Sequence, residues 1–198
     1  MNISDLTPKD KNYLARQYQT GQTPNLEKLK KWLARRGFKP LEESGTFADV
    51  YVNSSKPYVI KVSFASDKAY LLYAQFAKEN AKSNPLLPRI HDIWHTEDMF
   101  LVVTEKLYEC IDYEFVEMIE YAIETYQEHT LSPKDATGYI LENIKQDYEF
   151  YVDWFKKNYQ HVFAIAQFVN DSDANLDLHI GNVMMRSENE FVITDPVT

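Results

Sequence analysis

The sequence predicts an α+β fold, in which a small antiparallel five-stranded sheet with one helix precedes a reduced, mainly helical second lobe. Three observations favour this class. β-rich runs separated by short turns fill residues 38–107, apolar side chains recur at helical spacing from 112 to 170, and a short hairpin pattern follows. No repeat or long linker interrupts the chain. We therefore expect one domain over residues 1–198, consisting of N-terminal helices (1–37), a sheet lobe (38–107) and a helical lobe (108–198).

Two helices are expected at the start of the chain. Each begins at a Thr-Pro pair, Thr7-Pro8 or Thr23-Pro24, which supplies a cap and a first-turn proline. Gly21 and Gly37 end them. One face of the second helix carries the apolar residues Leu26, Leu29, Trp32 and Leu33. This helix should therefore pack on the sheet or between the lobes.

Two pairs of β-rich runs contribute to the predicted five-stranded sheet. Residues 42–52 and 56–62 are joined by an Asn-Ser-Ser turn. Residues 90–95 and 100–104 flank a second turn at Glu97-Asp98-Met99 and complete the five-stranded sheet.

One helix is expected between these two pairs of strands. It begins at the cap Ser66-Asp67, and Ser83-Asn84-Pro85 marks its end. Its predicted apolar face consists of Ala69, Leu72, Tyr73, Phe76 and Ala77. Glu79 is its only carboxylate beyond the cap.

The region 112–170 is predicted to be helical, with a break at 129–133 and a second start near Asp135. Its aromatic residues at helical spacing are Tyr148, Phe150, Tyr151, Trp154, Phe155, Tyr159, Phe163 and Phe168. We expect these rings to form the core of the second lobe. A stacking platform for nucleic-acid bases is disfavoured, because no basic groove accompanies the rings.

Three polar residues near the end of the chain are candidates for a base and two metal ligands. Asp177 precedes Asn182, and Asp195 follows the apolar pairs Val183-Met184 and Val192-Ile193. These pairs are expected to form a hairpin that holds Asn182 and Asp195 against one metal-bound phosphate group. The alternative is that the Asp and Asn residues only cap helices and build turns, as in any soluble protein.

The spacing of these residues resembles that of the protein-kinase catalytic loop and the metal-binding residue that follows it. The resemblance implies a protein-kinase-like fold. It also implies that Asp177 accepts the proton of a substrate hydroxyl, that Asn182 and Asp195 hold Mg²⁺, and that Lys61 reaches the α- and β-phosphates of ATP.

Other elements of the kinase pattern are partly present. Of the three glycines in a phosphate-covering loop only Gly45 remains, and Val50 stands at its expected place. Glu79 is the candidate partner of Lys61, although a solvent-facing Glu79 is an open alternative. The resemblance also places Glu105, with its neighbours 104–107, at the back of the nucleotide site.

The chain is also similar to a narrower group, the early-expressed serine/threonine protein kinases of short-tailed bacteriophages. The shared segments are Arg36-Gly37-Phe38-Lys39, Val59-Ile60-Lys61-Val62, the stretch 177–184 and Ile193-Thr194-Asp195-Pro196-Val197. In the last of these, Thr-Asp-Pro replaces the usual Asp-Phe-Gly. The resemblance covers residues 36–198 and implies a kinase that transfers the γ-phosphate of ATP to a hydroxyl of host proteins.

The chain departs from a protein kinase because it stops three residues after Asp195, without an activation segment. Peptide recognition would then depend on other elements. Two further functions therefore stay open. One is a weak or inactive kinase-fold protein that binds and inhibits a host enzyme or defence complex. The other is a small-molecule phosphotransferase, although such enzymes usually have a larger helical lobe.

Composition narrows the range of partners. The net charge of −9 argues against nonspecific nucleic-acid binding, which needs a surplus of Lys and Arg. The basic cluster within 28–36 is expected to be a solvated helix face. One cysteine, Cys110, excludes an internal disulfide, and the sequence has no membrane span or signal peptide. We expect a protein of the host bacterial cytoplasm.

Overall fold

The computed structural model describes residues 26–41, 48–95, 99–128 and 132–198. The chain divides into two compact units. The first contains the residues up to Lys68 together with Ile90–Lys106, and the second contains Ala69–Arg89 and Leu107–Thr198. Gly45, Thr7-Pro8, Gly21 and Thr23-Pro24 lie outside the described residues.

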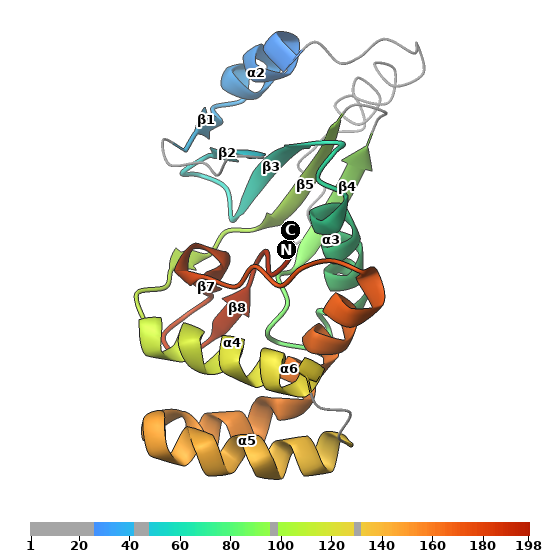
Figure 1. Cartoon of the computed structure of the whole chain (residues 1–198). Coiled ribbons are helices and arrows are strands. Elements are labelled where there is room, and N and C mark those ends of the chain that lie inside the picture. Colours follow the sequence, from blue (N-terminus) through green and yellow to red (C-terminus); the bar gives the residue numbers. More distant parts are fainter. Residues whose placement is uncertain (1–25, 42–47, 96–98, 129–131) are drawn as a thin grey trace. The chain divides into compact units, whose positions relative to one another are not determined.

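The first unit is built on the predicted five-stranded antiparallel sheet, which is confirmed (Figure 1). Its strands, in spatial order, are β1 (Lys39–Pro40), β2 (Ala48–Val52), β3 (Tyr58–Phe64), β5 (Met99–Glu105) and β4 (Ile90–His95). The turn between β2 and β3 depends on Asn53. Its side-chain oxygen accepts hydrogen bonds from Ser55 N (2.9 Å) and Oγ (2.8 Å), and its amide donates to Arg36 O.

Helix α2 (Leu26–Arg35) packs on one face of this sheet. Leu29, Trp32 and Leu33 are buried against sheet residues that include Tyr51, Ile60 and Val62. Gly37 ends the helix at φ +77°, where Phe38 N donates to Leu33 O (3.1 Å) and Gly37 N donates to Ala34 O (3.0 Å). This arrangement is a Schellman motif, and it turns Phe38 back into the same core.

The second unit combines four α-helices with a small sheet. The helices are α3 (Lys68–Asn80, in this unit from Ala69 on), α4 (Tyr113–Glu128), α5 (Pro133–Asp147) and α6 (Val152–Ser172), with a 3₁₀ turn η1 (Glu149–Tyr151) before α6. Helices α4, α5 and α6 pack against one another (Figure 1). The three-stranded antiparallel sheet has the order β6 (Tyr108–Glu109), β7 (Val183–Met185) and β8 (Phe191–Ile193). None of the helices within the described ranges is long and apolar enough to cross a membrane.

The buried face of α3 differs from the predicted one. Tyr70, Tyr73, Ala74 and Ala77 are buried, whereas Leu72 is 45% exposed. The buried residues recur every three or four positions and therefore share one face of the helix, so that Leu72 falls on the opposite side.

The aromatic core of the second unit is only partly the predicted one. Phe155 and Phe163 are buried in α6, but Phe150 is 90% exposed. Phe150 lies in η1, between α5 and α6, and is therefore outside the register that buries the α6 rings. The ring of Phe115 in α4 instead stacks on Phe191 of β8. This contact joins the helices to the small sheet.

Candidate functional site

The segment after α6 is held by the end of the chain. Asp173 leaves the helix at φ 56°, and residues 175–177 then run antiparallel to 196–198. Asn175 and Thr198 exchange two backbone hydrogen bonds (3.1 and 3.0 Å), and Asp177 N donates to Pro196 O (2.8 Å). The backbone of Asp177 is thus bonded to the residue that follows Asp195.

Asn182 connects this segment to the hairpin. It ends a short 3₁₀ turn, η2 (Ile180–Asn182), and its side-chain amide donates to Asp177 O (2.8 Å). Its own carbonyl accepts hydrogen bonds from Thr194 N (2.7 Å) and Thr194 Oγ1 (3.0 Å). His179 supports the turn, because its Nδ1 accepts a hydrogen bond from Gly181 N (3.1 Å).

The hairpin predicted from the apolar pairs is present as β7 and β8. Val183 pairs with Ile193, so that Asn182, directly before β7, stands beside Thr194, directly after β8. Asp195 follows Thr194. Asp177, Asn182 and Asp195 therefore lie on adjacent, hydrogen-bonded segments of the second unit, and all three are half-buried.

The donor atoms of this group suit a hard divalent cation. Because the amide nitrogen of Asn182 is engaged by Asp177 O, its Oδ1 is left as the free coordinating atom. An amide oxygen and a carboxylate are the ligand types that Mg²⁺ accepts in proteins. Asn182 and Asp195 thus fit the metal role predicted for them, which stays a prediction.

Three of the residues predicted to bind the nucleotide, Val50, Lys61 and Glu105, lie in the described part of the first unit. Lys61 on β3 pairs with Val50 on β2. Because Ile60 and Val62 point into the α2 core, alternation along the strand places Lys61 and Val50 on the opposite face. Glu105 ends β5 opposite Tyr58 and is 8% exposed.

Glu79 is the penultimate residue of α3 and is exposed. It belongs to the second unit, whereas Lys61 belongs to the first. Their pairing therefore stays a prediction.

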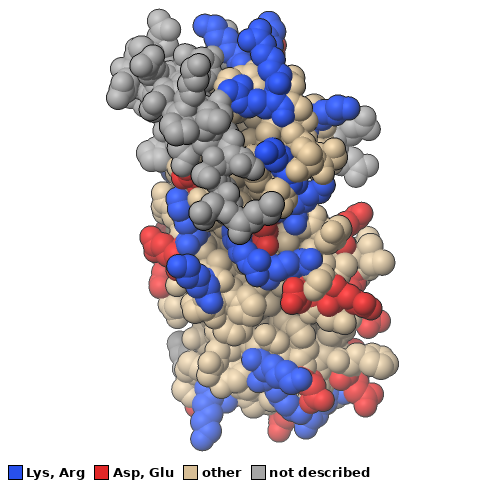
Figure 2. All heavy atoms as spheres, turned by 180° about the vertical axis from the view of Figure 1, so that it is seen from behind, with Lys and Arg blue, Asp and Glu red and all other residues tan. Residues whose placement is uncertain are grey.

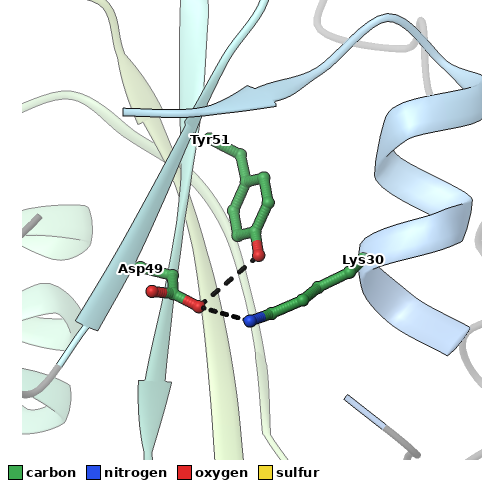
Figure 3. A network of polar contacts seen from close by, with 3 residues as sticks. All are labelled: Lys30, Asp49 and Tyr51. Carbon is green, nitrogen blue, oxygen red and sulfur yellow. Dashed lines mark hydrogen bonds and ion pairs between the residues drawn. The ribbon is translucent and has the colours of Figure 1, made fainter. Parts of the chain in front are cut away.

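A separate cavity of about 320 Å³ lies on the α2 side of the sheet, opposite to the face of Lys61. Asp49 sits at its wall, 3.5 Å from both Lys30 Nζ and the Tyr51 hydroxyl (Figure 3). Burial and the nearby Asp49 carboxylate raise the pKa of Tyr51 to about 12. Tyr51 is therefore a neutral donor to Asp49 at physiological pH.

The basic cluster of α2 lies at the surface of the first unit. Lys28, Lys31 and Arg35 are exposed, and Figure 2 shows Lys and Arg side chains gathered over this helix. The guanidinium of Arg36 lies 3.9 Å from the ring centroid of Trp32. These positions are those of a solvated helix face, as predicted.

The sequence did not indicate several residues that hold the segments of Asp177, Asn182 and Asp195 in place. Arg186 Nη1 donates to Pro85 O (3.0 Å) and its Nη2 to Leu87 O (3.2 Å), while Ile193 N donates to Leu86 O (2.8 Å). The sequence pattern places Tyr73 only on an apolar face, yet its hydroxyl donates to Ile193 O. A tyrosine inside an apolar stripe was the available signal, since a buried hydroxyl needs a partner.

Comparison with known proteins shows what the chain resembles. No curated protein sequence matches it. Among solved structures, an aminoglycoside phosphotransferase from Streptomyces rimosus is 14% identical, with a TM-score of 0.41, over 89% of this chain and 78% of that chain. The sequence model of the family described as bacteriophage T7 protein kinase 0.7 matches residues 5–198. This match confirms the resemblance that the sequence motifs indicated. Because it covers nearly the whole chain, the chain belongs to the bacteriophage T7 protein kinase 0.7 family.

Proposed function

We propose that this chain, a phosphotransferase of a kinase family, is an ATP-dependent serine/threonine protein kinase that acts on host proteins in the bacterial cytoplasm. The observation that carries this proposal is the hydrogen-bonded arrangement of residues 175–182 and 193–198, which gathers Asp177, Asn182 and Asp195.

In the proposed reaction, the hydroxyl oxygen of the substrate attacks the γ-phosphorus while the bond to the β–γ bridging oxygen breaks. The hydroxyl proton passes to the carboxylate of Asp177, and ADP leaves. Asp177 suits this role because its backbone N–H and C=O are already bonded to Pro196 and Asn182. Its half-buried side chain remains for a substrate.

The other residues would position the nucleotide. Asn182 and Asp195 would hold Mg²⁺, which when bound neutralises charge on the β- and γ-phosphates. Lys61 would contact the α- and β-phosphates. Val50 would pack on the nucleotide, and the backbone near Glu105 would meet the adenine.

The proposal can be tested by incubating the purified chain with γ-labelled ATP, Mg²⁺ and host lysate. We expect label on lysate proteins that disappears in Asp177→Ala and Asp195→Ala but persists in Asp171→Ala, a matched control on the exposed end of α6. Acid hydrolysis of the labelled proteins should release phosphoserine and phosphothreonine.

Two results would contradict the proposal in different ways. Label confined to phosphotyrosine would refute serine and threonine as the acceptors. If no label is transferred and inhibition of a host enzyme persists in both variants, the protein is instead a kinase-fold binding protein.

A further inference from the structure

Tyr73 lies in the middle of α3. This side chain is fully buried, and its hydroxyl donates to the carbonyl oxygen of Ile193 at 2.6 Å. Its ring packs edge-on against Phe168 of α6, with the centroids 5.6 Å apart. A buried tyrosine whose hydroxyl is bonded to main chain fixes both the helix and the strand that it contacts.

Ile193 is the last residue of β8, two residues before Asp195. Both its N–H and its C=O group are hydrogen-bonded. Its N–H donates to Leu86 O (2.8 Å), and its carbonyl accepts from Tyr73. The next N–H, that of Thr194, donates to Asn182 O. The backbone leading to Asp195 thus has little freedom to shift.

The phenol lies in an environment that disfavours its charged form. Burial raises the pKa of Tyr73 well above its ordinary value, and the charge of Asp195 raises it further. The hydroxyl therefore stays protonated and remains a donor throughout the physiological pH range.

Ile193, whose carbonyl accepts the hydrogen bond of Tyr73, is also held by the loop 84–87. Asn84, buried after α3, donates to His161 O of α6 (3.0 Å) and accepts from Leu86 N (3.0 Å). The loop 84–87 is therefore anchored to α6, and Leu86 in turn holds Ile193. Tyr73 is the member of this support that comes from α3 itself.

We propose that Tyr73 is a positioning residue for Asp195: through Ile193 it ties α3 to the end of β8 and so sets where the Asp195 carboxylate meets the metal-bound nucleotide. The inference rests on the proposed metal role of Asp195. The Tyr73 hydroxyl would then link α3 to the residue proposed to bind the metal. The helix's only carboxylate, Glu79, is exposed near its end.

The test is Tyr73→Phe, which removes one oxygen and keeps the ring. ADP affinity is measured by calorimetry with and without Mg²⁺, and Mg²⁺ is titrated in the kinase assay. We expect the Mg²⁺ dependence of ADP binding, and the Mg²⁺ concentration for half-maximal activity, to shift by about threefold to tenfold, the loss typical of one hydrogen bond. Metal-free ADP binding should change less than twofold.

The matched control is Tyr126→Phe, whose ring stacks on Phe163 at 4.3 Å in the same unit. It should leave both titrations unchanged. If Tyr73→Phe only lowers the unfolding temperature and its Mg²⁺ dependence equals that of the wild type, the positioning role is refuted. For a strongly destabilised variant, the extra thermal stabilisation by Mg²⁺ plus ADP over ADP alone gives the same comparison.

Asp195→Ala in the same titrations separates this inference from the proposed function. Loss of the Mg²⁺ dependence in Asp195→Ala together with a normal Tyr73→Phe refutes the inference alone. An unchanged Mg²⁺ dependence in Asp195→Ala refutes the metal role of Asp195 and the inference with it.

Discussion

The two hairpins that carry the candidate residues are built differently. In β2–β3, Val50 and Lys61 lie within the strands, and strand pairing alone sets the face on which they stand. In β7–β8, Asn182 and Asp195 lie just beyond the strand ends. Asp177 O accepts a hydrogen bond from the Asn182 amide, and Ile193, two residues before Asp195, is bonded to Leu86 and Tyr73. The main chain around Asn182 and Asp195 is thus held by hydrogen bonds from several segments of the second unit, whereas Val50 and Lys61 are placed by strand pairing within the first.

The largest expected effect comes from the tightly held hairpin region. Asp177→Ala should lower turnover by about 10² to 10⁴, the usual contribution of positioned proton transfer, and should leave ATP binding nearly intact. Initial rates and nucleotide affinity measure the two quantities, with Asp171→Ala as the control. Loss of ATP binding in Asp177→Ala would count against its assignment as the base.

Lys61→Ala tests the β2–β3 hairpin. We expect ATP affinity to fall by about tenfold to a hundredfold, because a hydrogen bond to a charged group is lost. The fold should be retained, since Lys61 is half-buried and strand pairing does not need its ammonium group. Lys39→Ala, at an exposed position of β1 in the same sheet, is the control. Equal affinities in the two variants would remove Lys61 from the site.

Asn84→Ala measures how much the support of the second hairpin contributes to stability. It leaves buried partners of Asn84 unsatisfied, so the free energy of unfolding should fall by about 1–3 kcal/mol in urea titrations. Asn143→Ala, whose side-chain amide bonds only within the exposed face of α5, should change it far less. Similar losses in both variants would show that the loop 84–87 is not a special support.

The smallest effect concerns the side of the first hairpin that faces α2. The Tyr51 pKa of about 12 exceeds its unfolded value near 10, so folding favours the protonated phenol. The resulting stabilisation is complete below pH 10 and is lost as the pH rises from 10 to 12. It should amount to on the order of 1–2 kcal/mol. The free energies of unfolding of the wild type and of Tyr51→Phe should therefore depend differently on pH only between pH 10 and 12. Parallel curves through this range would contradict the raised pKa of Tyr51.

Local patterns in the sequence were sufficient for much of the fold. Alternating β-rich runs predicted the antiparallel sheet, and the pairs Val183-Met184 and Val192-Ile193 predicted the second hairpin. The apolar face Leu29, Trp32 and Leu33 predicted that α2 packs on the sheet or between the lobes, and it packs on the sheet. Such predictions succeed because strand and helix periodicity depend on residues close in sequence. They failed for Leu72 and Phe150, whose exposure depends on distant neighbours.

The sequence by itself determined the kinase family, the spacing of Asp177, Asn182 and Asp195, and the strand position of Lys61. Only the tertiary structure showed that residues 175–177 pair with 196–198, that Arg186 holds the loop 84–87 and that Tyr73 bonds Ile193. The reason is physical. A repeating pattern reports which face of an element is buried, but a hydrogen bond between residues 120 positions apart is chosen by packing, which no local pattern encodes.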